Sequence, residues 1–236
     1  MSTCQWPLLV SQRSESFLLT DPCPEKQDRP EIVAFLSSDR AVKFADGTIE
    51  KNVDSVLFCT GYSYSFPFLD TLDPPLIGDG THVQNLYQHL IYRSNPTLAF
   101  PTLQQRIIPF PMAEAQSSVL SRLWSNRISL PSDIEMKAWE EDLYNETGGG
   151  RDFHLLKFPK DAEYINAMHD WAMSAEDPKH GKDPPYWAEK EFWMRERFPA
   201  IKKAFQDRGE ERRNVTSVEQ LGFDFEKFKR GHTDGM

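Results

Sequence analysis

A short apolar run, Ser55-Val-Leu-Phe-Cys59, stops abruptly at Thr60-Gly61 and constrains the fold of this chain more than any other segment. The run is apolar on both faces apart from its ends, which predicts a strand buried between two layers. A glycine at the end of a strand lets the backbone approach a ligand closely, because no Cβ intervenes. In open α/β sheets, ligands lie outside the carboxyl ends of the strands. The run therefore predicts an α/β fold in which this strand ends at a ligand, although a Thr-Gly pair after a strand is common by itself.

The residues before this run predict an antiparallel hairpin. Residues 32–36 and 41–44 are rich in β-prone side chains, and Asp46-Gly47 separates the second segment from Thr48-Ile49. Asp-Gly between two β-prone runs is a strong hairpin signal, because glycine accepts the positive φ of a tight turn. Residues 1–30 are polar, broken by prolines and without sustained periodicity, so they predict an irregular leader.

The residues after the run predict two extended pieces and a helix. Residues 84–103 suggest two strands around an Asn95-Pro96 turn. Pro111 then opens a helix that we expect to run from Met112 to about Asn126, with its apolar side chains on one face.

The remaining residues, 132–236, predict a helical tail. Ser132 with Glu135 three residues later makes a capping box, and the helix that it starts ends at a run of three glycines, residues 148–150. Two further helices are expected at about 160–174 and about 185–208, the second broken near Pro199.

Composition excludes several classes of partner. The chain has 236 residues, enough to bury a sizeable core, and its 27 basic and 36 acidic residues give a net charge of −9. This charge argues against nucleic acid or an anionic membrane as the main partner. No run approaches the roughly 18 apolar residues of a membrane span, and the first residues have no signal-peptide pattern. Three cysteines without a Cys-x-x-Cys pair fit a reducing compartment, so we expect a cytoplasmic protein.

Two longer stretches resemble the flavin-containing monooxygenases. The stretch VDSVLFCTGYSYSFPFL, residues 53–69, is similar to the segment in which an Ala-Thr-Gly-Tyr strand joins the NADPH domain of that family back to its FAD domain. The stretch from NLYQHLIYRSNPTLAF to PFPMAEAQ, residues 85–116, is similar to the return segment of fungal members. The resemblance covers roughly residues 31–175, because several motifs occur in the family's order and at the family's spacing.

The resemblance implies an enzyme with two nucleotide cofactors, FAD and NADPH. Reduced flavin in this family activates oxygen and passes one atom to a small substrate with a nucleophilic sulfur or nitrogen, a thiol or an amine. The resemblance places Thr60, Gly61 and Tyr62 at the crossover between the domains. It also implies that the helix beginning around Pro111 presents its amino end to the flavin, where a helix dipole favours negative charge.

The resemblance further implies cofactor-binding roles for four residues at this helix start, namely Pro111, Ala113, Glu114 and Gln116. Glu114 and Gln116 are the expected organisers of that end. No catalytic residue and no metal ligand is predicted.

Two departures from the family pattern change what this chain can do. The family usually has Phe-x-Gly-Leu where the backbone approaches flavin, whereas this chain reads Phe100-Pro101-Thr102-Leu103. The chain also lacks a Gly-x-Gly-x-x-Gly turn, which the family uses twice to hold its dinucleotides. The nearest string, Gly78-Asp-Gly80, has no third glycine, no strand before it and no helix after it.

The chain is therefore identified as the carboxyl-terminal half of a flavoprotein with two dinucleotide-binding domains. The expected divisions are a leader (1–30), the end of the NADPH-domain-like hairpin with the crossover strand (31–62), the return segment of the FAD domain (63–131) and the helical tail (132–236). Three functional alternatives stay open: a monooxygenase half completed by a separate amino-terminal half, a catalytically inactive truncated product, and a non-redox binding module.

Several other residues are expected to have only structural roles. We expect Cys59 to be an inert buried thiol, His169 to be packed in the core, and Glu140-Glu141 to be a solvated helix face. His82 and His89 lack a second ligand at metal spacing. Ser63 and Ser65 have no supporting His and Asp arrangement, which leaves no basis for a hydrolase.

Overall fold

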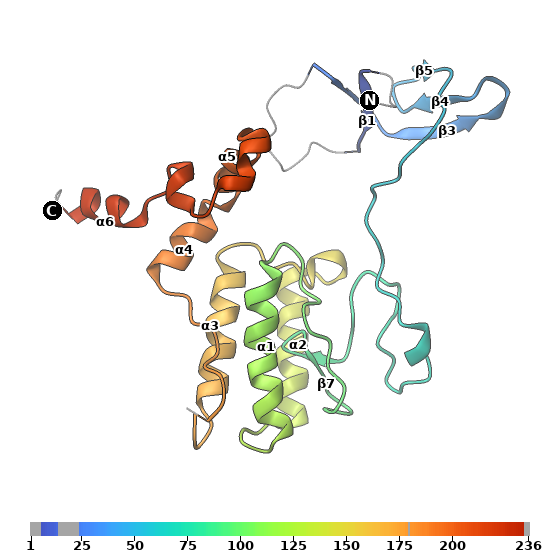
Figure 1. The fold of residues 1–236 in the computed structure, drawn as a ribbon. Helices are drawn as coiled ribbons and strands as arrows, with labels where there is room; N and C mark the ends of the chain where they lie inside the picture. The colour runs from blue at the N-terminus through green and yellow to red at the C-terminus, as the bar shows by residue number, and fades with distance from the viewer. Residues whose placement is uncertain (1–5, 14–23, 179, 234–236) are drawn as a thin grey trace. The chain divides into compact units, whose positions relative to one another are not determined.

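The computed structural model describes residues 6–13, 24–178 and 180–233, and it divides the chain into two compact units, Met1–Gly61 and Tyr62–Met236 (Figure 1). The chain is α/β, with small sheets in the first unit and helices dominating the second. The division between the two units falls after Gly61.

The first unit contains two small sheets. β3 (Ile32–Leu36), β4 (Ala41–Phe44) and β5 (Ile49–Glu50) form an antiparallel sheet in that order. The predicted hairpin turn is confirmed: Gly47 has a φ of 85°, and the Asp46 carboxylate accepts the Thr48 N–H at 2.9 Å.

The predicted irregular leader, residues 1–30, is wrong in part. β1 (Leu8–Ser11) and β2 (Lys26–Arg29) pair in parallel within it, while residues 1–5 and 14–23 lie outside the described residues. The two strands were missed because they are short and carry no alternating apolar pattern.

The prediction of a buried strand at residues 55–59 is wrong. The segment is not a strand, and its side chains are exposed, with Leu57 at 86% and Phe58 at 68% of full exposure. Cys59, expected to be buried, is also exposed. A strand needs neighbours that accept its backbone hydrogen bonds, and the described part of the chain offers none to residues 55–61.

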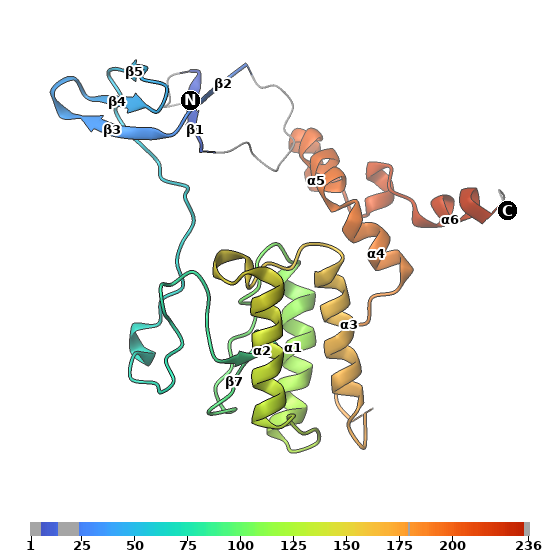
Figure 2. The ribbon, with the colours of Figure 1, turned by 180° about the vertical axis from the view of Figure 1, so that it is seen from behind.

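The second unit is built around three helices that stand side by side in both views (Figures 1 and 2). They are α1 (Pro109–Trp124), α2 (Asp133–Thr147) and α3 (Lys160–Met173). α1 packs on α3 through fully buried side chains that include Met112, Val119 and Ile165. The predicted apolar face of α1 is confirmed for its inner residues, whereas Trp124 at the helix end is half exposed.

A hairpin of β6 (Leu86–Tyr87) and β7 (Ile91–Tyr92) lies against α2. Its turn residues, Gln88 and His89, both have a φ of 54°, and Ile91 also bridges to Ala99. The two extended pieces expected in residues 84–103 are thus present, but the first hairpin turn precedes the Asn95-Pro96 turn.

Local signals at the ends of α2 are confirmed. Ser132 and Glu135 form the reciprocal capping box, and the helix ends at Gly148, whose φ of 74° places it in the left-handed region. The ring of Tyr144 then lies against Gly149, where a Cβ would come within 2.3 Å of the ring. Gly148 therefore ends the helix, and Gly149 leaves room for the Tyr144 ring.

The helical tail continues through α4 (Glu189–Glu196), α5 (Phe198–Asp207) and α6 (Phe225–Thr233). The predicted break near Pro199 is confirmed, since one residue separates α4 from α5. α6 contacts α4 through the Trp193 ring, which meets Phe225 edge-on and Phe228 at a tilt, and the Arg197 guanidinium lies 4.8 Å from the Trp193 ring and 5.0 Å from the Phe228 ring. Short 3-10 helices lie at Ser37–Asp39, Pro67–Leu69, Gly150–Asp152, Gly209–Asn214 and Val218–Leu221.

A buried ion pair joins α4 to α3. The Arg195 Nε donates to the Asp161 carboxylate at 2.5 Å, and a second guanidinium nitrogen donates to the carbonyl of Arg106 at 2.9 Å. Asp161 is completely buried. One arginine therefore holds the tail to α3 and to the loop before α1.

Candidate cofactor-facing helix start

The amino end of α1 offers fewer hydrogen-bond donors than a typical helix start. Two of its first three residues, Pro109 and Pro111, have no N–H, so Phe110 supplies the one backbone donor among them. The next N–H, that of Met112, already bonds to the Ile108 carbonyl at 3.4 Å. The macrodipole still favours negative charge at this end, but hydrogen bonding to a ligand is limited to very few groups.

The predicted site residues on α1 lie at different depths. Pro111, Ala113 and Glu114 are half-buried, and Glu114 forms an ion pair with Lys182. Gln116 is fully buried. The first three residues could lie near a ligand, whereas Gln116 acts on the structure around it.

Every polar atom of the Gln116 side chain is engaged inside the protein. Its Oε1 accepts the N–H of Thr102 at 2.8 Å. Its Nε2 donates to Tyr164 Oη at 3.1 Å and to Gln104 Oε1 at 3.3 Å, and Tyr164 Oη donates to the Gln88 carbonyl at 2.6 Å. Burial raises the pKa of Tyr164 above its usual range, so this hydroxyl remains a donor. Gln116 is thus the centre of a buried network that joins α1, α3 and two loops.

Thr102 adopts the backbone conformation that the family pattern assigns to glycine. Its φ is 60°, in the left-handed region that β-branched residues rarely occupy. The hydrogen bond from its N–H to Gln116 holds this conformation, and its hydroxyl donates to the Pro101 carbonyl at 2.7 Å. The backbone turn is therefore kept without glycine, while a side chain is added where glycine has none.

Thr60, Gly61 and Tyr62 are exposed, and they fall at the division between the units. Gly61 has a φ of 81° and nothing within 4 Å of the place where a Cβ would lie. This φ favours glycine, and the space where a Cβ would lie is open. Thr60 and Gly61 end the first unit, whereas the predicted residues of α1 belong to the second.

The Gly78-Asp-Gly80 string serves a contact within the chain and is not a phosphate loop. The carbonyl of Gly80 accepts the Tyr64 N–H at 2.8 Å. A Cβ on Gly80 would lie 3.1 Å from the Cβ of Ser63, and its φ of 80° also favours glycine. This glycine lets two loops approach each other.

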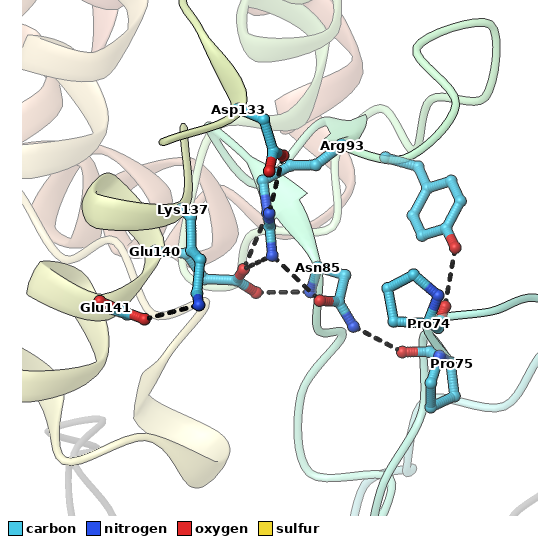
Figure 3. A network of polar contacts seen from close by, with 9 residues as sticks. Pro74, Pro75, Asn85, Arg93, Asp133, Lys137, Glu140 and Glu141 are labelled. Carbon is cyan, nitrogen blue, oxygen red and sulfur yellow. Dashed lines mark hydrogen bonds and ion pairs between the residues drawn. The ribbon is translucent and has the colours of Figure 1, made fainter. Parts of the chain in front are cut away.

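A second polar site, missed from the sequence, joins the β6–β7 hairpin to α2 (Figure 3). Glu140, expected to be solvated, accepts the Asn85 N–H at 2.5 Å and pairs with Arg93 at 3.1 Å. Arg93 also pairs with Asp133 at 3.1 Å. The network borders an open hollow of about 260 Å³. No sequence pattern indicates this network, because Glu140 and Arg93 are far apart along the chain.

Neighbouring glutamates on α2 give a matched test of this network. Glu140 has a side-chain exposure of 16%, whereas Glu141 is 63% exposed and pairs with Lys137. We expect Glu140→Gln to lower the free energy of unfolding by about 2 kcal/mol. This loss is smaller than that for breaking a buried pair whose arginine has no second carboxylate, because Arg93 still pairs with Asp133. Glu141→Gln should change it by less than about 0.5 kcal/mol. Equal losses in urea unfolding of the two variants would contradict the structure.

His169 does not have the structural role that was expected of it. His169 is half-buried at the surface of α3, where it bonds to Asp170 at 2.9 Å and its ring lies beside Tyr186. It is therefore not the core residue that was expected. Within the described residues, no group of three or more His, Cys, Asp or Glu side chains is placed to hold a metal ion. The helices of the described part also include none with the length and apolar character needed to cross a bilayer.

Comparison with known proteins identifies the class to which this fold and this helix start belong. The sequence model of the family described as flavin-binding monooxygenase-like matches residues 27–176, more than half of the chain. The chain belongs to this family, whose members bind flavin. The motifs around Thr60-Gly61 and at the start of α1 lie inside the matched range.

Relatives and a solved structure agree with this assignment. The chain is 31% identical over 165 residues to the flavin-containing monooxygenase iboF of Amanita muscaria, covering 62% of this chain and 31% of the relative. It is 33% identical over 109 residues to a thiol-specific monooxygenase of Saccharomyces cerevisiae, covering 42% and 25%. The structure of S-allyl-L-cysteine S-oxygenase from Allium sativum superposes with a TM-score of 0.63 at 26% identity, covering 90% of this chain and 46% of the oxygenase. The chain thus spans a third or less of these two relatives and under half of the solved oxygenase.

Proposed function

We propose that this chain supplies the carboxyl-terminal part of an NADPH-dependent flavin monooxygenase that oxygenates a nucleophilic sulfur. The family match over residues 27–176 carries the proposal. Sulfur is favoured over nitrogen because two of the similar proteins are named for a thiol and for S-oxygenation of S-allyl-L-cysteine. Bound FAD, reduced by NADPH, would supply the oxygen-transfer chemistry, and the protein would orient the reactants and exclude water.

The residues of this chain fit one edge of a flavin and not its phosphates. The Phe110 N–H and the positive end of the α1 dipole would favour negative charge on the ring. Gln116 would hold the backbone of Thr102 in place beside it. The sequence has no glycine-rich phosphate turn, so the pyrophosphate must be held by residues other than these.

The exposed segment at residues 55–61 supports a need for a complementing amino-terminal half. Its backbone forms no hydrogen bond to the backbone of any other described residue, and Leu57 and Phe58 expose large apolar surfaces. An extended segment of this kind is suited to pairing with strands of another sheet. We infer that a nucleotide-binding half, joined to this chain or separate from it, supplies those strands.

A complementation assay tests the proposal. The chain is mixed with the separately expressed amino-terminal portion of the Amanita relative, which corresponds to the length that this chain does not cover. We expect the mixture to retain FAD on gel filtration and to consume NADPH when N-acetylcysteine is added, with a weaker response to trimethylamine. The chain alone should do neither.

Two outcomes would contradict the proposal. Cooperative unfolding of the chain alone, with no FAD retained in any mixture, would favour a non-redox binding module. FAD retention without NADPH consumption would favour an inactive product.

In the complementing mixture, Leu57→Ser should weaken FAD retention, and Ile134→Ser, at an exposed position on α2, is the matched control.

A further inference from the structure

Two buried histidines, His89 and His154, form a hydrogen-bonded pair that the proposed function does not use. Their Nδ1 atoms lie 2.9 Å apart, and the side chains are 2% and 1% exposed. The Val83 N–H donates to His154 Nε2 at 3.0 Å. Two segments that are distant in the sequence, residues 83–89 and the segment around His154, therefore meet at this pair.

These contacts determine which nitrogen carries the proton on each ring. His154 Nε2 accepts the Val83 N–H, so it carries no proton, and in a neutral ring the proton must then be on Nδ1. His154 Nδ1–H donates to His89 Nδ1, which leaves the proton of His89 on Nε2. A second proton on either ring would turn an accepting nitrogen into a donor that faces another N–H donor. Proton uptake by His154 on Nε2 therefore breaks the hydrogen bond from Val83, and proton uptake by His89 on Nδ1 breaks the hydrogen bond between the two rings.

The pair is connected to the loop that leads into α1. The His154 carbonyl accepts the Gln105 N–H at 2.8 Å, and the Gln105 carbonyl accepts the Leu156 N–H at 3.1 Å. Tyr64, whose ring lies 5.4 Å from that of His154, donates from its hydroxyl to the Leu103 carbonyl at 2.6 Å. Loosening of His154 would thus free the residues just before the helix start.

The groups that face the two imidazoles are aromatic or titratable rings, and none of them carries the negative charge that a buried imidazolium would need. They are Tyr64, His82, Trp139, Phe153 and Tyr164. Tyrosine stays neutral at acidic pH, and the interaction with His82 lowers the pKa of His154 further. These neighbours offer no negative charge to compensate a buried imidazolium.

We propose that His89 and His154 form an acid-sensitive latch, which ties residues 83–89 and 153–156 to the loop before α1 and releases that loop when the pair takes up protons. The release itself is a property of this chain. Its consequence for flavin binding at the α1 start rests on the proposed function.

The direction of the pH dependence follows from burial. Burial lowers the pKa of His89 to about 3, with His154 as the second cause, and lowers the pKa of His154 to about 4, with His82 as the second cause. An open form exposes both rings, whose ordinary pKa is about 6.5. As the pH falls from 6.5 towards 4, the open form binds protons that the closed form does not bind. The closed form is therefore disfavoured by about tenfold per pH unit for each histidine.

The first test is side-chain nitrogen NMR of the whole chain at pH 7, without cofactor. We expect His154 to be the Nδ1–H tautomer and His89 the Nε2–H tautomer. A proton on His154 Nε2, or titration of His89 with a pKa above 6, would overturn the latch. This measurement needs no variant, and a failure of the proposed monooxygenase function would leave its outcome unchanged.

The second test is amide exchange at pH 7 and pH 4.5. The protection factors of Val83, Gln105 and Leu156 should fall together by about a hundredfold or more, while that of Met168 in α3 changes less. His154→Gln, which can accept the Val83 N–H without titrating, should remove about half of the fall on a logarithmic scale because His89 still titrates, and His169→Gln should behave as the wild type. Unchanged protection in the wild type, or an equal fall at Met168, would overturn the proposal. If His154→Gln does not fold, the wild-type comparison decides.

Discussion

Replacing Asp161 with alanine should lower the free energy of unfolding by about 3–5 kcal/mol, because it leaves a buried guanidinium without its carboxylate. Asp161 is completely buried, and its partner Arg195 is only 13% exposed. The Asp161 carboxylate also accepts the N–H of Ala162 at 3.0 Å, so the same change removes a hydrogen bond in the first turn of α3. Urea unfolding followed by circular dichroism measures the loss.

The preceding residue provides a matched control for this change. Lys160 forms an exposed ion pair with Glu146, and exposed pairs contribute less than about 1 kcal/mol. Lys160→Ala should therefore unfold close to the wild type. A loss below about 1 kcal/mol in Asp161→Ala would show that Arg195 finds another partner or water, contrary to the buried geometry.

Replacing Gln116 with leucine should cost about 2–3 kcal/mol, because leucine keeps the volume but leaves the Thr102 N–H and its other partners without the amide. The loss should be accompanied by faster exchange of the Thr102 amide, since the left-handed turn is no longer held. Unfolding in urea and amide exchange at residue 102 provide the two measurements.

Ser117→Ala, at the exposed neighbouring position, is the control and should change stability by less than about 0.5 kcal/mol. If Gln116→Leu lost stability without affecting the Thr102 amide, the glutamine would only fill space. Gln116→Glu separates two roles of this residue in a complemented enzyme. If Gln116 contacts flavin directly, Gln116→Glu should weaken FAD binding. If Gln116 only positions Thr102, FAD binding should change mainly when the Thr102 backbone is disturbed.

Features set by neighbouring residues in the chain could be predicted from the sequence. The Asp46-Gly47 turn, the capping box at Ser132, the helix end at Gly148 and the break near Pro199 depend on residues a few positions apart. Their energetics are local, and the pattern alone defines them.

Features that depend on distant partners could not be predicted. The pattern of residues 55–59 predicts a buried strand, but pairing requires strands that the described chain does not provide, and the segment is exposed. The sequence predicts a solvated Glu140, because nothing near it in the sequence indicates Arg93. His89 and His154 meet only through the packing of α2 and α3 around them, and neither has a neighbour in the sequence that signals a pair.

The candidate site shows the same division. The motif at the α1 start predicts about where a helix begins. The contacts that each side chain makes can be known only from the folded structure. Gln116 turns inward to Thr102, and the two prolines leave Phe110 as the donor. The missing glycine at position 102 raised a doubt about the backbone turn, and the structure resolves it through a hydrogen bond from fourteen residues away.

The anchoring of the tail by Arg195 also has a consequence for the order of folding. Its two acceptors lie 34 and 89 residues earlier in the chain, on α3 and in the loop before α1. Contacts of such separation are among the last to become favourable, because long loops must close before they form. α4 can reach its anchor only after α1 and α3 have come together. A fluorescence change at Trp193, on the same helix, should therefore follow bundle formation in refolding and report its completion.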